Sequence, residues 1–174
     1  MAWQSKYKNV KPVTPRWFIA AAVVSALMLA TAHAFETFGH LAPCELCLHQ
    51  REGYWAALWV GLIGYGVARW RHDLARPLLL LVALVFLGET VVAAYHAGVE
   101  WKWWAGPARC TGARTSVSAS DMSALLSGAK IHIVRCDEAA WRMFGLSMAG
   151  WNTLVALALT VVSVVMALRL RTRR

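Results

Sequence analysis

The sequence predicts an all-α integral membrane protein, a bundle of four transmembrane helices in a single domain that covers residues 1–174. Two observations lead to this fold class. First, 59% of the residues are hydrophobic and only 16% are charged, whereas a soluble domain carries about a quarter charged residues. Second, the chain contains four apolar stretches of roughly the length that a membrane requires. So apolar a chain is also too poorly solvated to stay disordered in water.

The four transmembrane helices are expected at residues 17–35, 47–68, 77–96 and 146–168. A helix needs about 20 residues to cross the hydrocarbon core of a bilayer. The second stretch is short, so its helix should begin earlier, near Pro43. The first stretch also has features of a signal peptide, because Ala32-His33-Ala34 follows a basic leader and an apolar run. A retained anchor agrees better with the other three spans.

Basic residues are concentrated at one end of the expected bundle. Lys and Arg outnumber Asp and Glu by ten in the two tails and the loop between the second and third spans, whereas the other side carries one more acid than base. The positive-inside rule therefore places both termini in the cytoplasm, and the loops at 36–46 and 97–145 face outward. The net charge of +9 is accounted for by these flanks, so no nucleic-acid partner is expected.

All four cysteines fall on the outward side: Cys44 and Cys47 at the end of the first loop, Cys110 and Cys136 in the second. In a bacterium this side is oxidising, and disulfides persist there. Two structural disulfides in a non-catalytic four-span adaptor are one explanation. The Cys-x-x-Cys spacing favours another, because so small a ring removes little chain entropy but suits thiol–disulfide exchange.

Two neighbours of this motif support exchange chemistry. Pro43 and Cys44 have the pattern of a helix start, where free backbone N–H groups favour a thiolate. Arg51 follows Cys47 by four residues, which on a helix places the guanidinium one turn away from the sulfur. A permanent cation there stabilises a thiolate and, near a membrane, can hold an anionic electron acceptor.

Other cofactor chemistry fits less well. Covalent haem attachment requires histidine directly after Cys-x-x-Cys, but Leu48 occupies that position. A haem held by two membrane histidines remains a third alternative, although it leaves the cysteines unexplained. A zinc site would need a second close pair, and 25 residues separate Cys110 from Cys136. No metal is therefore predicted.

Three further features of the outward half need an interpretation. Met122, Leu125, Leu126 and Ala129 recur at helical spacing, which predicts a short interfacial helix or, alternatively, ordinary loop packing. Glu89 lies about two-thirds of the way along the third span, where it is either a proton carrier or a head-group contact or, alternatively, a carboxylate facing the bundle near the outer surface. His96 falls near the outer boundary of the same span.

The motifs together resemble the quinone-reducing thiol oxidase family DsbB, and the resemblance covers nearly the whole chain. They are the segments 43–51 (PCELCLHQR), 98–101 (GVEW), 104–107 (WAGP), 110–112 (CTG), 136–138 (CDE) and 144–152 (FGLSMAGWN). The resemblance implies a protein of the bacterial inner membrane with periplasmic loops. Its expected activity is to reoxidise a DsbA-like thioredoxin-fold protein and to pass the electrons to the membrane quinone pool.

The resemblance also implies a role for each site residue. The partner would attack a Cys110–Cys136 disulfide, the freed Cys136 would attack Cys44, and the released Cys47 thiolate would pass electrons to quinone. Arg51 is expected to hold the quinone, and His96 matches the position of a quinone-proximal histidine. Ubiquinone and menaquinone both remain open, as do the particular partner and the oligomeric state.

Overall fold

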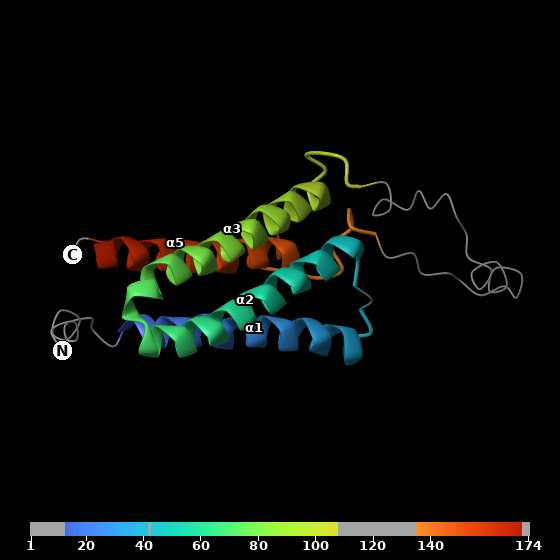
Figure 1. Cartoon of the computed structure of the whole chain (residues 1–174). Helices are drawn as coiled ribbons and strands as arrows, with labels where there is room; N and C mark the ends of the chain where they lie inside the picture. Colours follow the sequence, from blue (N-terminus) through green and yellow to red (C-terminus); the bar gives the residue numbers. More distant parts are fainter. Residues whose placement is uncertain (1–12, 42, 108–134, 172–174) are drawn as a thin grey trace, which may run out of the picture.

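The computed structural model describes residues 13–41, 43–107 and 135–171, and it contains four long helices (Figure 1). These are α1 (Val13–Thr37), α2 (Glu45–Trp70), α3 (Ala75–Glu100) and α5 (Met148–Arg171). A short 3-10 turn, η2 (His72–Leu74), joins α2 to α3. Strands β1 (Arg142–Met143) and β2 (Leu146–Ser147) form an antiparallel hairpin just before α5.

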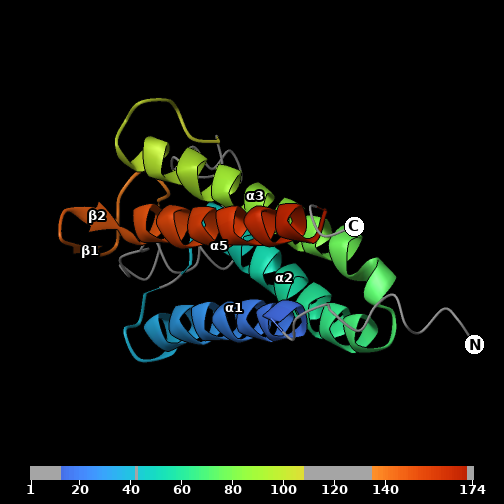
Figure 2. The ribbon, with the colours of Figure 1, turned by 90° about the vertical axis from the view of Figure 1, so that its left-hand side faces the viewer.

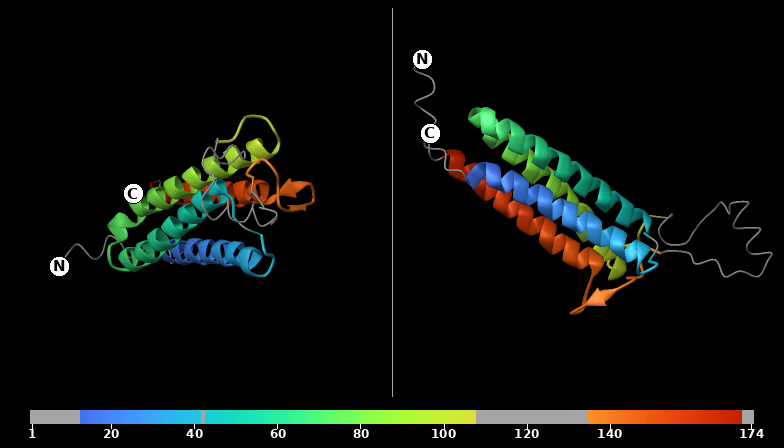
Figure 3. Two further views of the ribbon diagram at one scale, coloured as in Figure 1. Left: turned by 90° about the vertical axis from the view of Figure 1, so that its right-hand side faces the viewer. Right: turned by 90° about the horizontal axis from the view of Figure 1, so that it is seen from below.

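The helices form a bundle in which α1 packs on α2, α2 on α3, and α3 on α5. Figure 2 shows α2 crossing between α1 and the pair formed by α3 and α5. The start of α1, the α2–α3 turn and the end of α5 all lie at one end of the bundle (Figure 1). The hairpin lies at the opposite end, as both views of Figure 3 show. This grouping of helix ends agrees with the arrangement expected from the charge pattern.

Three of the helical segments in the described ranges are long and apolar enough to cross a membrane: Pro15–Thr37, His72–Glu100 and Met148–Leu170. Large apolar side chains such as Leu27, Leu84 and Val161 point outward from them, as expected for surfaces in contact with lipid. The chain is thus an all-α membrane protein. That α2 also crosses the membrane stays a prediction, because its first turns carry Glu45, His49, Arg51 and Glu52.

A close contact between α1 and α2 depends on glycine. A Cβ atom at Gly61 would lie 2.9 Å from the backbone oxygen of Phe18, and one at Gly64 would lie 2.6 Å from the Phe18 ring. Phe18 itself is completely buried, together with Leu79 and Phe86 of α3. The two glycines therefore let α1 approach α2 closely enough for the aromatic ring to enter the core.

The described residues contain four long helices in the order expected for the spans, although the helix bounds differ from the expected span limits. Helix α1 starts at Val13, and α3 continues to Glu100 instead of ending at His96. Residues 146–147 belong to β2, so the last helix begins only at Met148. Hydropathy marks the apolar part of a helix, whereas backbone hydrogen bonding continues past it. The expected interfacial helix at 122–129 lies outside the described residues.

Candidate active site

Cys44 and Cys47 lie at the start of α2, as the sequence predicts. Cys44 is the N-cap residue in an extended conformation, and its Sγ accepts a hydrogen bond from the backbone N–H of Cys47 over 3.2 Å. Both thiols are free, and their sulfur atoms are 2.6 Å apart. The cap therefore holds the two sulfurs against each other, which is the arrangement that thiol–disulfide exchange requires.

The two thiols differ in their electrostatic environment. The side-chain hydrogen bond with Cys47, burial, and the repulsion of negative charge on Cys47 together raise the pKa of Cys44 above its ordinary range. The N–H of Cys47 acts in the opposite direction but is outweighed. For Cys44 these effects therefore oppose the thiolate that free backbone N–H groups at a helix start favour.

The third described cysteine, Cys136, packs against this pair. Cys136 is 1% exposed and forms a buried cluster with Cys44 and Leu46, with Cys47 packed on its edge. Cys136 is disulfide-bonded. Cysteines that are far apart in the sequence therefore meet at one point. Cys110 lies outside the described residues.

An ionic contact fixes the segment that carries Cys136 to the end of α3. Asp137 accepts hydrogen bonds from Arg135 at 2.9 and 2.8 Å and from Lys102 at 2.6 Å. These two cations lower the pKa of the Asp137 carboxyl well below its usual range. The carboxylate thus stays charged under all ordinary conditions, and it holds Cys136 close to the Cys-x-x-Cys pair.

Arg51 joins α2 to α1 beside the cysteines. Its Nη1 lies 2.5 Å from Oε2 of Glu36, and its Nη2 donates to the carbonyl oxygen of Ala32 over 3.2 Å. Arg51 and Cys47 line the same cavity. The expected cation is therefore present beside the reactive pair, and Glu36 holds it in place.

A cavity of about 160 Å³ opens between α1, α2, α5 and the segment after Arg135. Its apolar wall comes from side chains of α1, the Cys136 segment and α5, whereas its polar side is formed by residues of α2 and α3. The apolar wall includes Phe35, Trp141 and Met148, and the polar side includes Cys47, Arg51 and His96. Such a cavity suits a flat apolar ring that carries polar oxygen atoms.

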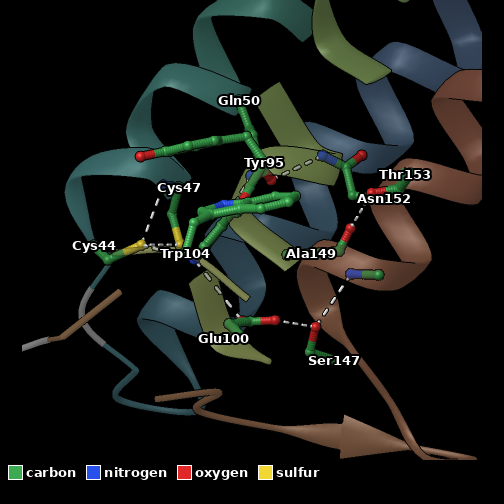
Figure 4. A network of polar contacts seen from close by, with 12 residues as sticks. Cys44, Cys47, Gln50, Tyr95, Glu100, Trp104, Ser147, Ala149, Asn152 and Thr153 are labelled. Atoms are coloured by element: carbon green, nitrogen blue, oxygen red, sulfur yellow. Dashed lines mark hydrogen bonds and ion pairs between the residues drawn. The ribbon is translucent and has the colours of Figure 1, made fainter. Parts of the chain in front are cut away.

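His96 is buried beside Cys44. Its Nε2 lies 3.7 Å from Cys44 Sγ and 3.8 Å from Oε1 of Glu100, and its ring also contacts the backbone of Cys136. Glu100 accepts a hydrogen bond from Ser147 Oγ, and Ser147 in turn accepts one from the N–H of Gly150 over 3.1 Å (Figure 4). These bonds attach the end of α3 to the first turn of α5.

A second group of buried polar side chains begins at the other ring nitrogen of His96, Nδ1. Gln50 Nε2 lies 2.9 Å from His96 Nδ1, and Gln50 Oε1 accepts from Asn152 Nδ2 over 2.8 Å. Asn152 Nδ2 also donates to Oε1 of Glu89 over 2.8 Å, and Asn152 Oδ1 accepts from the Tyr54 hydroxyl. Figure 4 shows Gln50 and Asn152 reaching toward each other from α2 and α5.

The side chain of Glu89 faces the interior of the bundle, as one interpretation of the sequence expects. Its side chain is 3% exposed, and it lies against the backbone of α2 at Gly53. A Cβ atom at Gly53 would be only 2.1 Å from Glu89 Oε2. A side chain at residue 53 would therefore displace the carboxylate from this position.

Sequence reasoning missed Gln50, Asn152, Glu100 and Ser147 as members of the site. A signal was available for two of them, since Gln50 and Asn152 are uncharged amides inside or beside otherwise apolar spans. Buried polar groups require partners, and in a membrane bundle these partners come from neighbouring helices.

The same geometry would also accept a thiophilic metal. One ligand atom each from Cys44, Cys47 and His96 lies within 4.8 Å of the others, and two thiolates with an imidazole are suitable ligands for zinc. The sequence predicts no metal, and that prediction stays a prediction. Assays of the site should therefore include a chelator.

Comparison with known proteins gives a consistent result. Residues 14–166 match the profile of the family described as disulfide bond formation protein DsbB. The chain is 26% identical over 156 residues to a disulfide bond formation protein B from Dechloromonas aromatica (strain RCB), covering 88% of this chain and 92% of that protein. It is also 24% identical over 148 residues to the uncharacterized protein RP370 of Rickettsia prowazekii (strain Madrid E), covering 79% and 78%.

Proposed function

Because this chain belongs to the DsbB family of disulfide bond formation proteins, we propose that it is a protein-thiol:quinone oxidoreductase. In this proposal it reoxidises a DsbA-like thioredoxin-fold dithiol protein and delivers the electrons to membrane quinone. The protein lies in the bacterial inner membrane with both termini in the cytoplasm, and the cysteine-bearing loops face the periplasm. The observation that carries the proposal is the packing of disulfide-bonded Cys136 against the free Cys44–Cys47 pair.

The thiol chemistry follows from this packing. A thiolate of the partner attacks a Cys110–Cys136 disulfide at Cys110, and the bond breaks with release of Cys136 as a thiolate. Cys136 then attacks Cys44 in the oxidised Cys44–Cys47 pair, and Cys47 leaves as a thiolate. Each exchange forms one S–S bond and breaks one, so no external oxidant is needed up to this point.

The cavity beside Cys47 is the proposed quinone site. Its apolar wall suits the ring, Arg51 would bind a carbonyl oxygen and any negative charge on it, and His96 borders the same space. A bound quinone supplies the final oxidant, since it takes up two electrons and two protons to become a quinol. The part played by this chain is to place Cys47 and a fixed cation on the same side of the cavity.

The direct test uses purified protein in detergent with a reduced DsbA-like protein and a short-chain ubiquinone or menaquinone. Quinone absorbance should fall catalytically with the wild type and with EDTA present. Turnover should be abolished in Cys47→Ser, whereas Arg51→Gln should raise the KM for quinone about tenfold or more, since charged hydrogen bonds contribute about 1.5–3 kcal/mol. The matched control is Arg69→Gln, which removes a cation from the far end of α2 and should leave KM unchanged.

The competing function is a non-catalytic adaptor with two structural disulfides. It predicts no quinone reduction with any acceptor, and it predicts that Arg51→Gln alters only stability. Absence of turnover in protein whose four cysteines are fully oxidised would overturn the oxidoreductase proposal.

A further inference from the structure

The buried amides beside His96 form a hydrogen-bond chain that has a direction. Asn152 Nδ2 has two protons, and it donates one to Glu89 Oε1 and the other to Gln50 Oε1, each over 2.8 Å. Because Gln50 uses its oxygen to accept from Asn152, it presents its nitrogen to His96 Nδ1. An amide nitrogen donates and cannot accept. Nδ1 of His96 must therefore be the unprotonated nitrogen.

The other ring nitrogen then carries the proton. A neutral imidazole has one N–H, so His96 is the tautomer with hydrogen on Nε2. The surroundings of Nε2 agree with this assignment, because it faces Cys44 Sγ at 3.7 Å and the carboxylate of Glu100 at 3.8 Å. Both are groups that accept hydrogen bonds.

The direction of the whole chain depends on Glu89. The Tyr54 hydroxyl can rotate and would serve an oxygen or a nitrogen of Asn152 equally well. Gln50 and Asn152 can each reverse their amide ends at little cost in volume. In its ionised form the Glu89 carboxylate, in contrast, only accepts, so Asn152 cannot then turn its oxygen toward Glu89 without bringing two acceptors together.

We propose that Glu89, in its ionised form, is a positioning residue that sets the direction of this chain and so holds His96 with its proton on Nε2, facing Cys44. Glu89 is not among the residues that line the cavity; it acts through Asn152 and Gln50. The hydrogen bonds from Asn152 to His96 thus all run in the same direction.

The role of the Nε2 proton of His96 in thiol exchange rests on the proposed function. When the Cys110 thiolate attacks Cys136 in a Cys44–Cys136 disulfide, the Cys110–Cys136 bond forms, the Cys44–Cys136 bond breaks and Cys44 is the leaving group. A donor at Nε2 stabilises the charge that develops on its sulfur, whereas the opposite tautomer would present a lone pair to it. The tautomer of His96 itself does not depend on which oxidant or partner the protein uses.

The test reads the tautomer directly. Full-length protein labelled with ¹⁵N-histidine is studied by NMR in detergent or lipid, since protonated and unprotonated ring nitrogens have well-separated shifts. The His96 signals are identified by their loss in His96→Gln. The wild type should show Nε2 protonated and Nδ1 unprotonated.

Two substitutions of nearly equal volume then probe the chain. In Glu89→Gln the new amide can donate or accept, so both directions become possible and a second His96 tautomer, protonated on Nδ1, should appear in comparable amount. In Gln50→Glu the carboxylate accepts only, so Nδ1 should become protonated in every molecule. Thr90→Val is the control, because among the described residues the Thr90 hydroxyl bonds only to Phe86 of its own helix; its spectrum should match the wild type.

The proposal is overturned if wild-type His96 carries its proton on Nδ1, or if Glu89→Gln leaves a single Nε2-protonated tautomer. These outcomes are distinct from a failure of the proposed function, because the spectra need neither quinone nor a partner protein. A functional consequence is measured separately. The single-turnover release of Cys44 from a Cys44–Cys136 disulfide should be slower in Glu89→Gln than in Thr90→Val.

Discussion

Asn152 is the residue on which the buried network depends, and its replacement by leucine should destabilise the protein strongly. The side chain makes three hydrogen bonds to other residues: one to Gln50, one to Glu89 and one from Tyr54. Leucine has a similar volume but offers none of them, so three buried polar groups on α2 and α3 would lose their partner. Because the two side chains have similar volumes, the loss of these hydrogen bonds is the main effect of the substitution.

The magnitude follows from measured hydrogen bonds in membrane bundles. Such bonds contribute about 0.6 kcal/mol on average and at most about 1.7 kcal/mol. Three of them give an expected loss of about 2 kcal/mol, with an upper bound of about 5 kcal/mol. The matched control is Thr160→Val on the same helix, because the Thr160 hydroxyl bonds only to the carbonyl of Ala156. That carbonyl keeps its helical partner, so the control should lose less than about 1 kcal/mol.

The assay is equilibrium unfolding in mixed micelles, extended to a double-mutant cycle. Glu89→Met removes the carboxylate with little change in length, and combined with Asn152→Leu it leaves no unpaired charge. The double variant should therefore be more stable than the sum of the two single effects predicts, by about 1 kcal/mol or more. An Asn152→Leu effect no larger than that of Thr160→Val would refute the reasoning, as would an additive cycle.

Two other predictions follow from the contacts. Gly53→Ala should lower the free energy of unfolding by about 1–3 kcal/mol, because its Cβ would lie 2.1 Å from Glu89 Oε2. The control is Gly66→Ala on the same helix, whose Cβ would meet nothing within 4 Å and which should raise the free energy of unfolding by up to about 1 kcal/mol. Equal thermal midpoints for the two variants would contradict this prediction. The pKa of Asp137 is lowered by Arg135 and Lys102, so the contact is fully present above the unfolded value of about 3.9 and is lost only as the pH falls below it. Hydrogen-exchange protection of the segment after Arg135 should thus be constant from pH 7 to about pH 4.5 and lower in Asp137→Asn at neutral pH; a loss of protection near pH 6 would speak against it.

The fold could be predicted because its determinants are local. Apolar length and flanking charge define the spans, and Pro43 with Cys44 marks the start of α2. The β1–β2 hairpin could not be predicted, because its two-residue turn is Phe144-Gly145 with φ of 53° and 82°. Hairpins of this kind are recognised by Asn-Gly or Asp-Gly, and phenylalanine at a positive φ gives no such signal.

The site was predictable only where chemistry is carried by single residues. Cysteines and an arginine at fixed spacing indicate exchange chemistry whatever the packing, and Cys44, Cys47 and Arg51 do line one cavity. The helix start alone predicts a thiolate at Cys44, whereas the hydrogen bond with Cys47 and burial raise the pKa of that thiol. A proton shared between two sulfurs cannot be assigned before their distance is known.

The role of Glu89 shows where sequence reasoning ends. The sequence places a carboxylate in an apolar span, which is costly unless it is paired, and so requires a partner without naming it. The partner is Asn152 on α5, and the space is provided by Gly53 on α2. Three helices must therefore pack before the charge has a function. Once they do, an acceptor that cannot be reversed orients two amides that can, and a buried carboxylate on α3 determines which nitrogen of His96 carries the proton.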